Sequence, residues 1–167
     1  SFLGSHKISI ETDTGSQKLE GEKVIIASGS KPLFLPFVDF NHSAVLTSEE
    51  ALELKKIPKS LLIVGAGVIG CEFASIFNPL GTKITMVEMM EQILPTEDKR
   101  IAQALQQTLQ KRGVNIFIRT KLEELIEYRE DGITARFDNG KEVTTEKILI
   151  SVGRAPNTGA WGWKIFL

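Results

Sequence analysis

A glycine-rich hexapeptide, Gly65-Ala66-Gly67-Val68-Ile69-Gly70, is the part of this sequence whose residue types and spacing best fit a chemical role. It directly follows an apolar run at residues 61–64, and Glu88 closes the next apolar run, about 20 positions further on. In such a pattern the first glycine permits a tight turn from strand to helix, and the second lets backbone N–H groups approach a pyrophosphate. The third lets the helix pack closely on the sheet. The spacing predicts a dinucleotide-binding turn; the alternative is a tight turn in an α/β domain that binds no nucleotide.

Glu88 is predicted to accept hydrogen bonds from the 2′-hydroxyl group of an adenosine ribose. The same carboxylate would repel a 2′-phosphate, and neither Met89 nor Met90 could bind a phosphate as an arginine would. We therefore expect the site to prefer NAD(H) over NADP(H). The alternative for Glu88 is a solvated carboxylate at the end of a strand.

Other reactive residue types are sparse. Glu72 lies in the first turns of the helix that would follow the glycines. It is either a site residue at the nicotinamide end or a carboxylate that the helix N-terminus favours. Cys71 is the only cysteine, which excludes an internal disulfide and a multi-cysteine metal site, and we interpret it as a small buried hydrophobe. His6 and His42 are expected on the surface or in loops, and no metal site is predicted.

The segment that holds these residues, 48–120, alternates between strand-like and helix-like patterns. The predicted elements are a helix at 48–54 with Ser48 as N-cap, a strand at 61–64, a helix at 68–77, a strand at 83–88, a helix at 97–111 and a strand at 114–118. In the last helix Ile101, Leu105 and Leu109 recur every four residues and indicate its buried face. Gly113 is predicted to end that helix. Strands and helices in alternation predict a right-handed parallel sheet.

The flanking segments show the two-residue period of half-buried strands. Strands are predicted at 7–12, at 22–27 as a more buried strand, and at 122–128, 132–137, 141–144 and 147–152, with a hairpin turn at Asp138-Asn139-Gly140. Residues 33–40 are apolar but interrupted by proline, so a partly exposed loop is expected there.

Composition limits the class of protein. The 167 residues include 20 basic and 21 acidic side chains, for a formal charge of -1, and 42% of the residues are hydrophobic. Near-neutral charge without a basic block argues against nucleic acid or a membrane surface as partner. The longest apolar run, residues 61–71, is too short for a bilayer span of about 20 residues. The first residues show no signal-peptide pattern, so we expect a soluble, intracellular protein.

Three stretches resemble the flavoprotein pyridine nucleotide–disulfide oxidoreductases. Residues 62–74, Leu-Ile-Val-Gly-Ala-Gly-Val-Ile-Gly-Cys-Glu-Phe-Ala, resemble the NAD-binding segment of that family. Residues 26–30, Ile-Ala-Ser-Gly-Ser, resemble its ATGS stretch, and residues 152–158, Val-Gly-Arg-Ala-Pro-Asn-Thr, resemble its VGRxPNT stretch. Val87-Glu88 together with Ile93-Leu94-Pro95 narrows the resemblance to the dihydrolipoamide dehydrogenase group.

The resemblance implies hydride exchange between NAD and a bound FAD, in an enzyme that oxidises dihydrolipoamide on a lipoyl domain of 2-oxo acid dehydrogenase complexes. It also implies a homodimeric parent enzyme in the bacterial cytoplasm or the mitochondrial matrix. Glu88 would contact the ribose, Leu122 the adenine, and Gly153 and Glu72 the nicotinamide end. The dinucleotide loop would consist of Ile63, Val64, Gly65, Ala66, Gly67, Val68, Ile69 and Gly70.

The family's FAD-binding glycine motif, its pair of redox-active cysteines and its His-Glu acid/base pair are absent from this sequence. We therefore expect an NAD-binding fragment of a longer enzyme, with no catalytic residue of its own and inactive by itself. The expected fold is α/β, a Rossmann-like parallel sheet with an antiparallel β-meander, flanked by strand remnants of an FAD-binding domain. The expected divisions are a partial FAD-domain segment at 1–47, the NAD-binding domain at 48–152 and the start of the return to the FAD domain at 153–167. The alternatives are a fragment of an NADH oxidase or of a soluble transhydrogenase, or a non-catalytic dinucleotide-binding module.

Overall fold

The computed structural model describes residues 1–129 and 132–159 of the chain. They divide into two compact units: residues 32–153, and a smaller unit of residues 1–31 with 154–159. None of the described helices is long and apolar enough to cross a membrane. Both the glycine motif and Glu88 belong to the larger unit.

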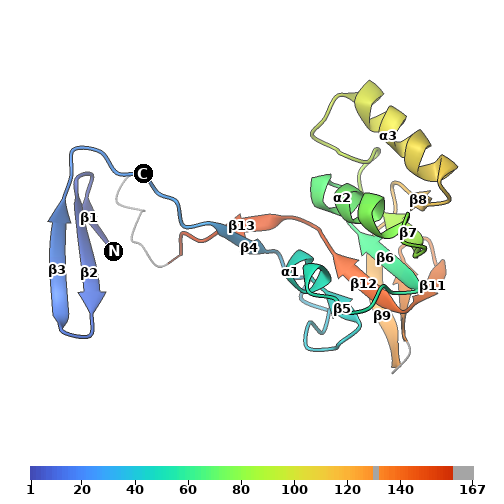
Figure 1. Ribbon diagram of the computed structural model, residues 1–167, viewed down its shortest axis with the longest axis horizontal. Coiled ribbons are helices and arrows are strands. Elements are labelled where there is room, and N and C mark those ends of the chain that lie inside the picture. The colour runs from blue at the N-terminus through green and yellow to red at the C-terminus, as the bar shows by residue number, and fades with distance from the viewer. Residues whose placement is uncertain (130–131, 160–167) are drawn as a thin grey trace. The chain divides into compact units, whose positions relative to one another are not determined.

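The larger unit is built on a five-stranded sheet in the order β5-β12-β6-β7-β8, in which every neighbouring pair is parallel. Its strands are β5 (Val45–Leu46), β6 (Ser60–Val64), β7 (Lys83–Val87), β8 (Asn115–Phe117) and β12 (Lys147–Ile150). From Leu61 to Val64 no residue is more than 5% exposed, as expected for a parallel strand that is covered on both faces. The predicted parallel sheet is confirmed (Figure 1).

Two helices, α2 (Val68–Phe77) and α3 (Lys99–Lys111), cover one face of this sheet (Figure 1). Leu61 and Ile63 of β6 point into the core on that face, where Phe73 and Leu109 lie among the helix residues. The bounds of α2 are those predicted, and Gly113 follows α3 with a positive φ of 89°, as a helix-ending glycine should.

The prediction that Ile101 lies on the buried face of α3 is wrong, because its side chain is 63% exposed. A helix turns once every 3.6 residues, so a spacing of four drifts around its surface. The buried stripe of α3 instead includes Ala102 and Leu109, with Leu105 partly buried beside them. Ile101 lies at the edge of that stripe, where α3 faces α2.

A short helix, α1 (Ser48–Leu52), precedes β6, and its predicted N-cap, Ser48, is wrong by one residue. The N-cap is Thr47, whose hydroxyl oxygen accepts a hydrogen bond from the Glu49 N–H at 3.2 Å. The Glu50 carboxylate in turn accepts from the Thr47 N–H at 2.8 Å and from the Thr47 hydroxyl. This reciprocal capping box uses a glutamate or glutamine three positions after the cap, and Glu50 has that spacing from Thr47.

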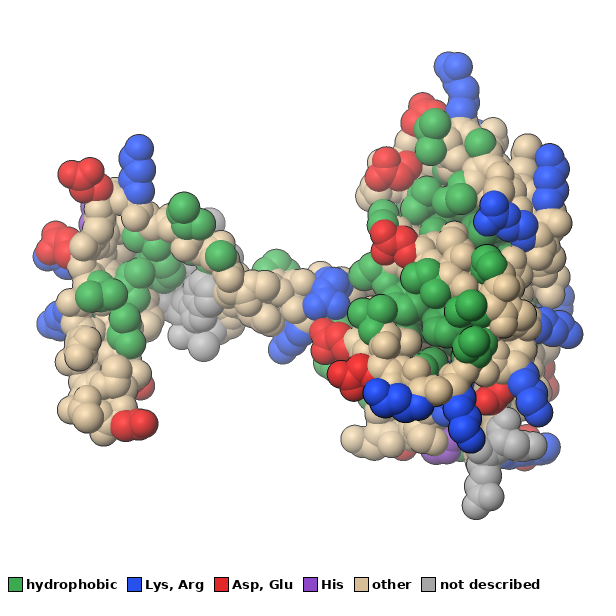
Figure 2. Space-filling model, viewed as in Figure 1, with side chains coloured by type: hydrophobic (Ala, Val, Ile, Leu, Met, Phe, Trp, Pro, Cys, Tyr) green, Lys and Arg blue, Asp and Glu red, His purple; other side chains and the backbone are tan. Residues whose placement is uncertain are grey.

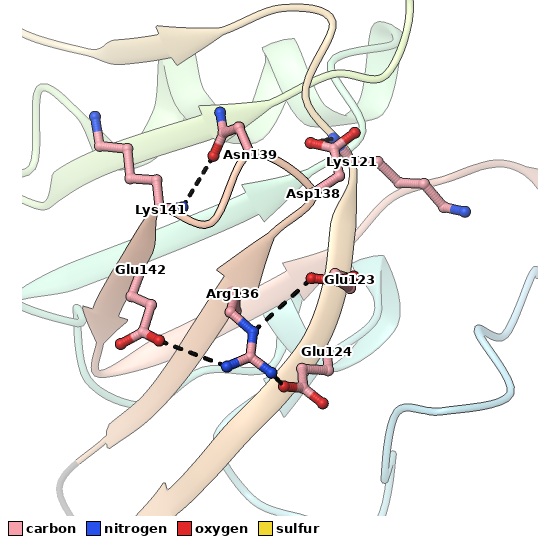
Figure 3. A network of polar contacts seen from close by, with 8 residues as sticks. All are labelled: Lys121, Glu123, Glu124, Arg136, Asp138, Asn139, Lys141 and Glu142. Atoms are coloured by element: carbon pink, nitrogen blue, oxygen red, sulfur yellow. Dashed lines mark hydrogen bonds and ion pairs between the residues drawn. The ribbon is translucent and has the colours of Figure 1, made fainter.

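The opposite face of the sheet is covered by an antiparallel meander in the order β11-β10-β9. Its strands are β9 (Leu122–Arg129), β10 (Gly132–Phe137) and β11 (Glu142–Thr145), and the predicted hairpin turn between β10 and β11 is confirmed. In β10 Ile133, Ala135 and Phe137 are fully buried, while Arg136 points outward. Its guanidinium forms an ion pair with Glu124 and lies 3.8 Å from each of Glu123 and Glu142 (Figure 3).

The apolar loop at residues 33–40 is only partly exposed, as expected. Phe34 and Phe37 are 56% and 45% exposed. Val38, however, is buried in the core beneath the meander, and Leu35 and Phe40 pack against that core. The loop therefore contributes to the stability of the larger unit.

The smaller unit contains a three-stranded antiparallel sheet in the order β1-β2-β3, with strands β1 (Phe2–Gly4), β2 (Lys7–Thr12) and β3 (Gly15–Glu20). A two-stranded pair joins β4 (Ser30–Pro32) to β13 (Arg154–Pro156). The strand predicted at 22–27 is wrong: this segment has no strand, and Ile25 and Ile26 are 91% and 51% exposed. An apolar run becomes a buried strand only where neighbouring strands and a covering layer are present. Among the described residues, the strand that pairs with β2 is β3, and no strand pairs with residues 22–27.

Candidate functional site

The turn from β6 into α2 begins at Gly65, whose φ of +95° lies in the region that favours glycine. Its N–H donates to the carbonyl oxygen of Val87 at 2.9 Å, which ties the turn to β7. A Cβ atom at Gly65 would lie 2.5 Å from the carbonyl oxygen of Ser151, just beyond β12. The first glycine is therefore required by the protein's own packing.

The third glycine, Gly70, lies in the first turns of α2 and packs directly on this turn. A Cβ atom there would lie 2.1 Å from the carbonyl oxygen of Gly65 and 3.0 Å from Oγ of Ser151. The Ser151 hydroxyl also lies within hydrogen-bond distance of the carbonyl oxygens of Gly65 (2.8 Å) and Val64 (3.0 Å). Close packing of the helix on the turn, as the spacing predicts, depends on Gly70. Ser151 belongs to the site although no sequence pattern singled it out.

Gly67, the second glycine, is different because no contact among the described residues requires it. Its φ of -71° is open to any residue, and a Cβ atom there would meet no atom within 4 Å. Gly67 is the N-cap of α2 and offers no side chain to the first-turn N–H groups, whereas α1 and α3 begin with the side-chain caps Thr47 and Asp98. By helix geometry these N–H groups have no partner within the helix, and they carry its positive dipole end. The turn thus presents uncapped donors to open space, an arrangement that can hold an anion.

The Glu88 carboxylate braces this turn from the end of β7. It is 6% exposed; Oε2 accepts from the Ala66 N–H at 2.7 Å and Oε1 accepts from the Met90 N–H at 2.9 Å. The backbone of Glu88 also pairs with β8 and its following loop, through the Phe117 carbonyl and the Thr120 N–H, both at 2.9 Å. Glu88 therefore lies beside the glycines and its oxygens hold the turn itself, a role that no sequence pattern indicated.

The loop after Glu88 closes on the same turn. The Leu94 N–H donates to the Ala66 carbonyl oxygen at 2.8 Å, and Leu94 has a positive φ of 47°. Ile93 beside it is fully buried. Both backbone groups of Ala66 are therefore held by the segment that follows β7, its N–H by Glu88 and its carbonyl by Leu94.

The remaining predicted site residues belong to several elements of the larger unit. Ile63 and Val64 are buried at the end of β6. Leu122 begins β9, is 3% exposed and belongs to the core beneath the meander. Gly153 follows β12 with a φ of +130° and accepts a hydrogen bond from the Leu33 N–H at 3.0 Å. Glu72 is exposed on α2. Val68 and Ile69 form the first turn of α2, and the Val68 side chain is 53% exposed.

Cys71 is buried, as predicted, at 4% exposure, and its thiol lies 3.4 Å from the Ala66 carbonyl oxygen. Burial, with smaller contributions from the negative charges of Glu88 and Glu72, raises the pKa of the Cys71 thiol to about 11. A thiol in this state is a poor nucleophile. Within the described residues there is no group of three or more His, Cys, Asp or Glu side chains that could hold a metal ion.

A shallow apolar groove runs between α2 and α3, beside the site. Its lining includes Val68, Ile76 and Ile101, which are 53%, 49% and 63% exposed. Figure 2 shows hydrophobic side chains gathered over α2 on this face of the unit.

A family model described as pyridine nucleotide-disulphide oxidoreductase matches residues 2–164 of the chain. The chain is 37% identical over 156 residues to a dihydrolipoyl dehydrogenase of Bacillus subtilis (strain 168). It is 35% identical over 164 residues to a soluble pyridine nucleotide transhydrogenase of Photorhabdus laumondii. These alignments cover 93% and 98% of this chain but 34% and 35% of the relatives, so the chain spans about a third of their length.

Two solved structures share the fold. The HOCl-induced flavoprotein disulfide reductase RclA from Escherichia coli is 29% identical, with a TM-score of 0.79, and the match covers 99% of this chain and 37% of that one. LpdA from Mycobacterium tuberculosis is 27% identical, with a TM-score of 0.81, over 94% of this chain and 34% of that one. The expected α/β fold, with a parallel sheet and antiparallel strands, is confirmed. Because the family model matches nearly the whole of this chain, the chain belongs to the pyridine nucleotide-disulphide oxidoreductase family.

Proposed function

We propose that this chain binds NAD(H), with the pyrophosphate at the turn from β6 into α2 and the adenosine ribose at Glu88. The observation that carries the proposal is Gly67, a glycine that neither backbone strain nor packing requires, at the uncapped N-terminus of α2. A side chain there would project into the space through which a phosphate would reach the first-turn N–H groups. A bound phosphate would explain why residue 67 is a glycine, because any side chain there would obstruct it.

Glu88 supports the same assignment for the ribose. A carboxylate has about four lone-pair sites, and the two backbone donors found here occupy two of them. The remaining capacity would accept ribose hydroxyls, while the negative charge would exclude a 2′-phosphate. Leu122 would contact the adenine. It lies two residues after Thr120, whose N–H donates to the Glu88 carbonyl oxygen and so brings this segment to the proposed ribose site. Glu72 and Gly153 would contact the nicotinamide end of the bound NAD(H).

We propose further that the chain is part of a longer flavoprotein that oxidises dihydrolipoamide with NAD through FAD. The likeness to a dihydrolipoyl dehydrogenase supports this, and the one buried cysteine means that the redox disulfide would lie outside the chain. Bound FAD and NAD would supply the hydride exchange, while this chain's residues would bind and orient the NAD. The parent would be a homodimer that serves the lipoyl domain of 2-oxo acid dehydrogenase complexes, in the cytoplasm or the mitochondrial matrix.

The proposed division of the chain assigns 48–152 to the NAD-binding domain and 1–47 and 153–167 to the FAD-binding domain. Residues 160–167 of the last segment lie outside the described residues.

A soluble transhydrogenase is the second candidate, because such an enzyme is 35% identical over 98% of the chain. A transhydrogenase exchanges hydride between NAD and NADP and must accept both. Comparable affinities for NADH and NADPH would favour it, and a clear preference for NADH would favour the dehydrogenase.

Titration of the purified 167-residue chain with NADH and NADPH, followed by nucleotide fluorescence, tests NAD(H) binding. We expect Gly67→Ala to weaken NADH binding at least about tenfold, because the added methyl group faces the phosphate. The same change should cost no more than about 1 kcal/mol of unfolding free energy, since alanine is only a poorer N-cap. Gly4→Ala is the matched control: Gly4 also has open surroundings but lies in the smaller unit. Undiminished NADH binding by Gly67→Ala, or no binding by the folded wild-type chain, would contradict the proposal.

A further inference from the structure

We propose that Glu91, through its ion pair with Arg119, is a second determinant of the choice between NAD(H) and NADP(H), in addition to Glu88. This inference rests on the proposed NAD(H)-binding function and concerns the adenosine end of the same site.

The backbone holds Arg119 close to the carboxylate that would face the ribose. The Arg119 N–H donates to the Met90 carbonyl oxygen at 2.9 Å, and the next N–H, that of Thr120, donates to the Glu88 carbonyl oxygen at 2.9 Å. The segment after β8 therefore runs along residues 88–90. The Glu88 side chain turns back within that stretch to accept from the Met90 N–H. The backbone of Arg119 is thus anchored beside the proposed ribose site, on the segment that pairs with residues 88–90.

The guanidinium is engaged by a carboxylate of the same loop. Nη2 of Arg119 lies 3.3 Å from Oε2 of Glu91, and both side chains line a polar groove of about 510 Å³ together with Lys99 and glutamines of α3. A 2′-phosphate that approached Glu88 would therefore meet one carboxylate and, next to it, an arginine whose charge is already balanced. Glu91 would in this way withhold from NADP(H) the cation that a phosphate binds best.

The Glu91–Arg119 pair is also weak enough to be tested cleanly. Its side chains are 70% and 73% exposed, and pairs of that kind contribute little to stability. Removing the Glu91 charge should therefore leave the fold intact and leave the guanidinium available. Arginine and phosphate form bidentate, charge-assisted hydrogen bonds, which are about twice as strong as neutral ones.

The experiment measures the ratio of the dissociation constants for NADPH and NADH, which differ only by the 2′-phosphate. In Glu91→Gln we expect this ratio to fall roughly tenfold, the size of one gained charge-assisted hydrogen bond. The gain should shrink as salt rises from 50 to about 500 mM, because both groups are exposed. Glu97→Gln is the matched control: Glu97 belongs to the same loop but lines the groove between α2 and α3 instead. It should leave the ratio unchanged.

A second variant assigns the gain to Arg119. Arg119 has a φ of +51°, a conformation that asparagine tolerates, so Arg119→Asn removes the charge with little backbone strain. The double variant Glu91→Gln, Arg119→Asn should return the ratio to its wild-type value. An unchanged ratio in Glu91→Gln, an equal fall in Glu97→Gln, or a gain that survives in the double variant would overturn the inference. Each of these results leaves NADH binding by the wild-type chain intact; loss of that binding would overturn the proposed function itself, and this inference with it.

Discussion

Replacing Glu88 by glutamine separates two roles of its carboxylate, which holds the glycine turn and, as proposed, binds the ribose. In the native chain its oxygens accept from the Ala66 and Met90 N–H groups at 2.7 and 2.9 Å, while the side chain is 6% exposed. A glutamine can offer one oxygen, so one of these two N–H groups would face an NH₂ group and keep no acceptor. The substitution therefore perturbs the turn even when no nucleotide is present.

The expected cost follows from these two bonds. Leaving one buried donor unsatisfied costs about 1–3 kcal/mol, and replacing a charged acceptor by a neutral one costs about 1 kcal/mol more. We expect Glu88→Gln to lower the free energy of unfolding by about 3 kcal/mol. Urea unfolding of the nucleotide-free chain, followed by far-UV circular dichroism, measures this quantity. Glu97→Gln, at an exposed position of the next loop, should change it by less than about 0.5 kcal/mol.

A loss in Glu88→Gln no larger than that of the Glu97→Gln control would refute the idea that this carboxylate braces the glycine turn. Glu88 would then be a ligand contact alone, and the variant would show only an altered preference between NADH and NADPH. A loss near 3 kcal/mol would instead mean that weakened nucleotide binding in any Glu88 variant has a structural part, which must be subtracted before its role in specificity is judged.

Three further predictions follow from other positions. Gly70→Ala places a methyl carbon 2.1 Å from the Gly65 carbonyl oxygen, so we expect a loss of at least about 3 kcal/mol in the same urea assay. The Cys71 thiol, with its pKa raised to about 11, should barely react with iodoacetamide in the native chain at pH 8, and its rate should keep rising toward pH 11; a plateau near pH 9 would contradict this. The hydrogen bond from the Thr47 hydroxyl lowers the pKa of Glu50 below 4.5, so its stabilising contribution is complete above that pH and is lost as the pH falls through the native pKa. Thr47→Ala should move the Glu50 midpoint, followed by NMR, back toward 4.5, and should cost about 1 kcal/mol.

The parallel unit could be predicted from the sequence because its signals are local. The bounds of α2 and β10 were predicted to the residue, since an apolar run, a glycine turn and a hairpin turn each act over a few neighbouring positions. The segment at 22–27 shows the limit of such reasoning. Its apolar residues have the composition of a buried strand, but burial depends on partner strands, which composition does not specify.

The contacts that build the site could not be predicted from the sequence, because they join residues that lie far apart along the chain. Ala66 and Glu88 are 22 residues apart, and Ser151 is 86 residues from the glycine whose carbonyl lies beside its hydroxyl. The strand order β12-β6-β7 brings these positions together at the carboxyl ends of three strands. A motif predicts that such a crevice exists, whereas the residues that support it depend on how the sheet is ordered.

The three glycines of the motif look equivalent in the sequence, and the structure separates them. Gly65 and Gly70 are required by contacts inside the protein, so they would be needed in a tight turn with or without a nucleotide. Gly67 has ordinary backbone angles and open surroundings, so a turn that bound nothing would tolerate a side chain there. The alternative of a nucleotide-free turn thus explains two glycines and leaves the third without a cause. Gly67→Ala is for that reason the substitution that distinguishes a turn that binds a nucleotide from a turn that serves the fold alone.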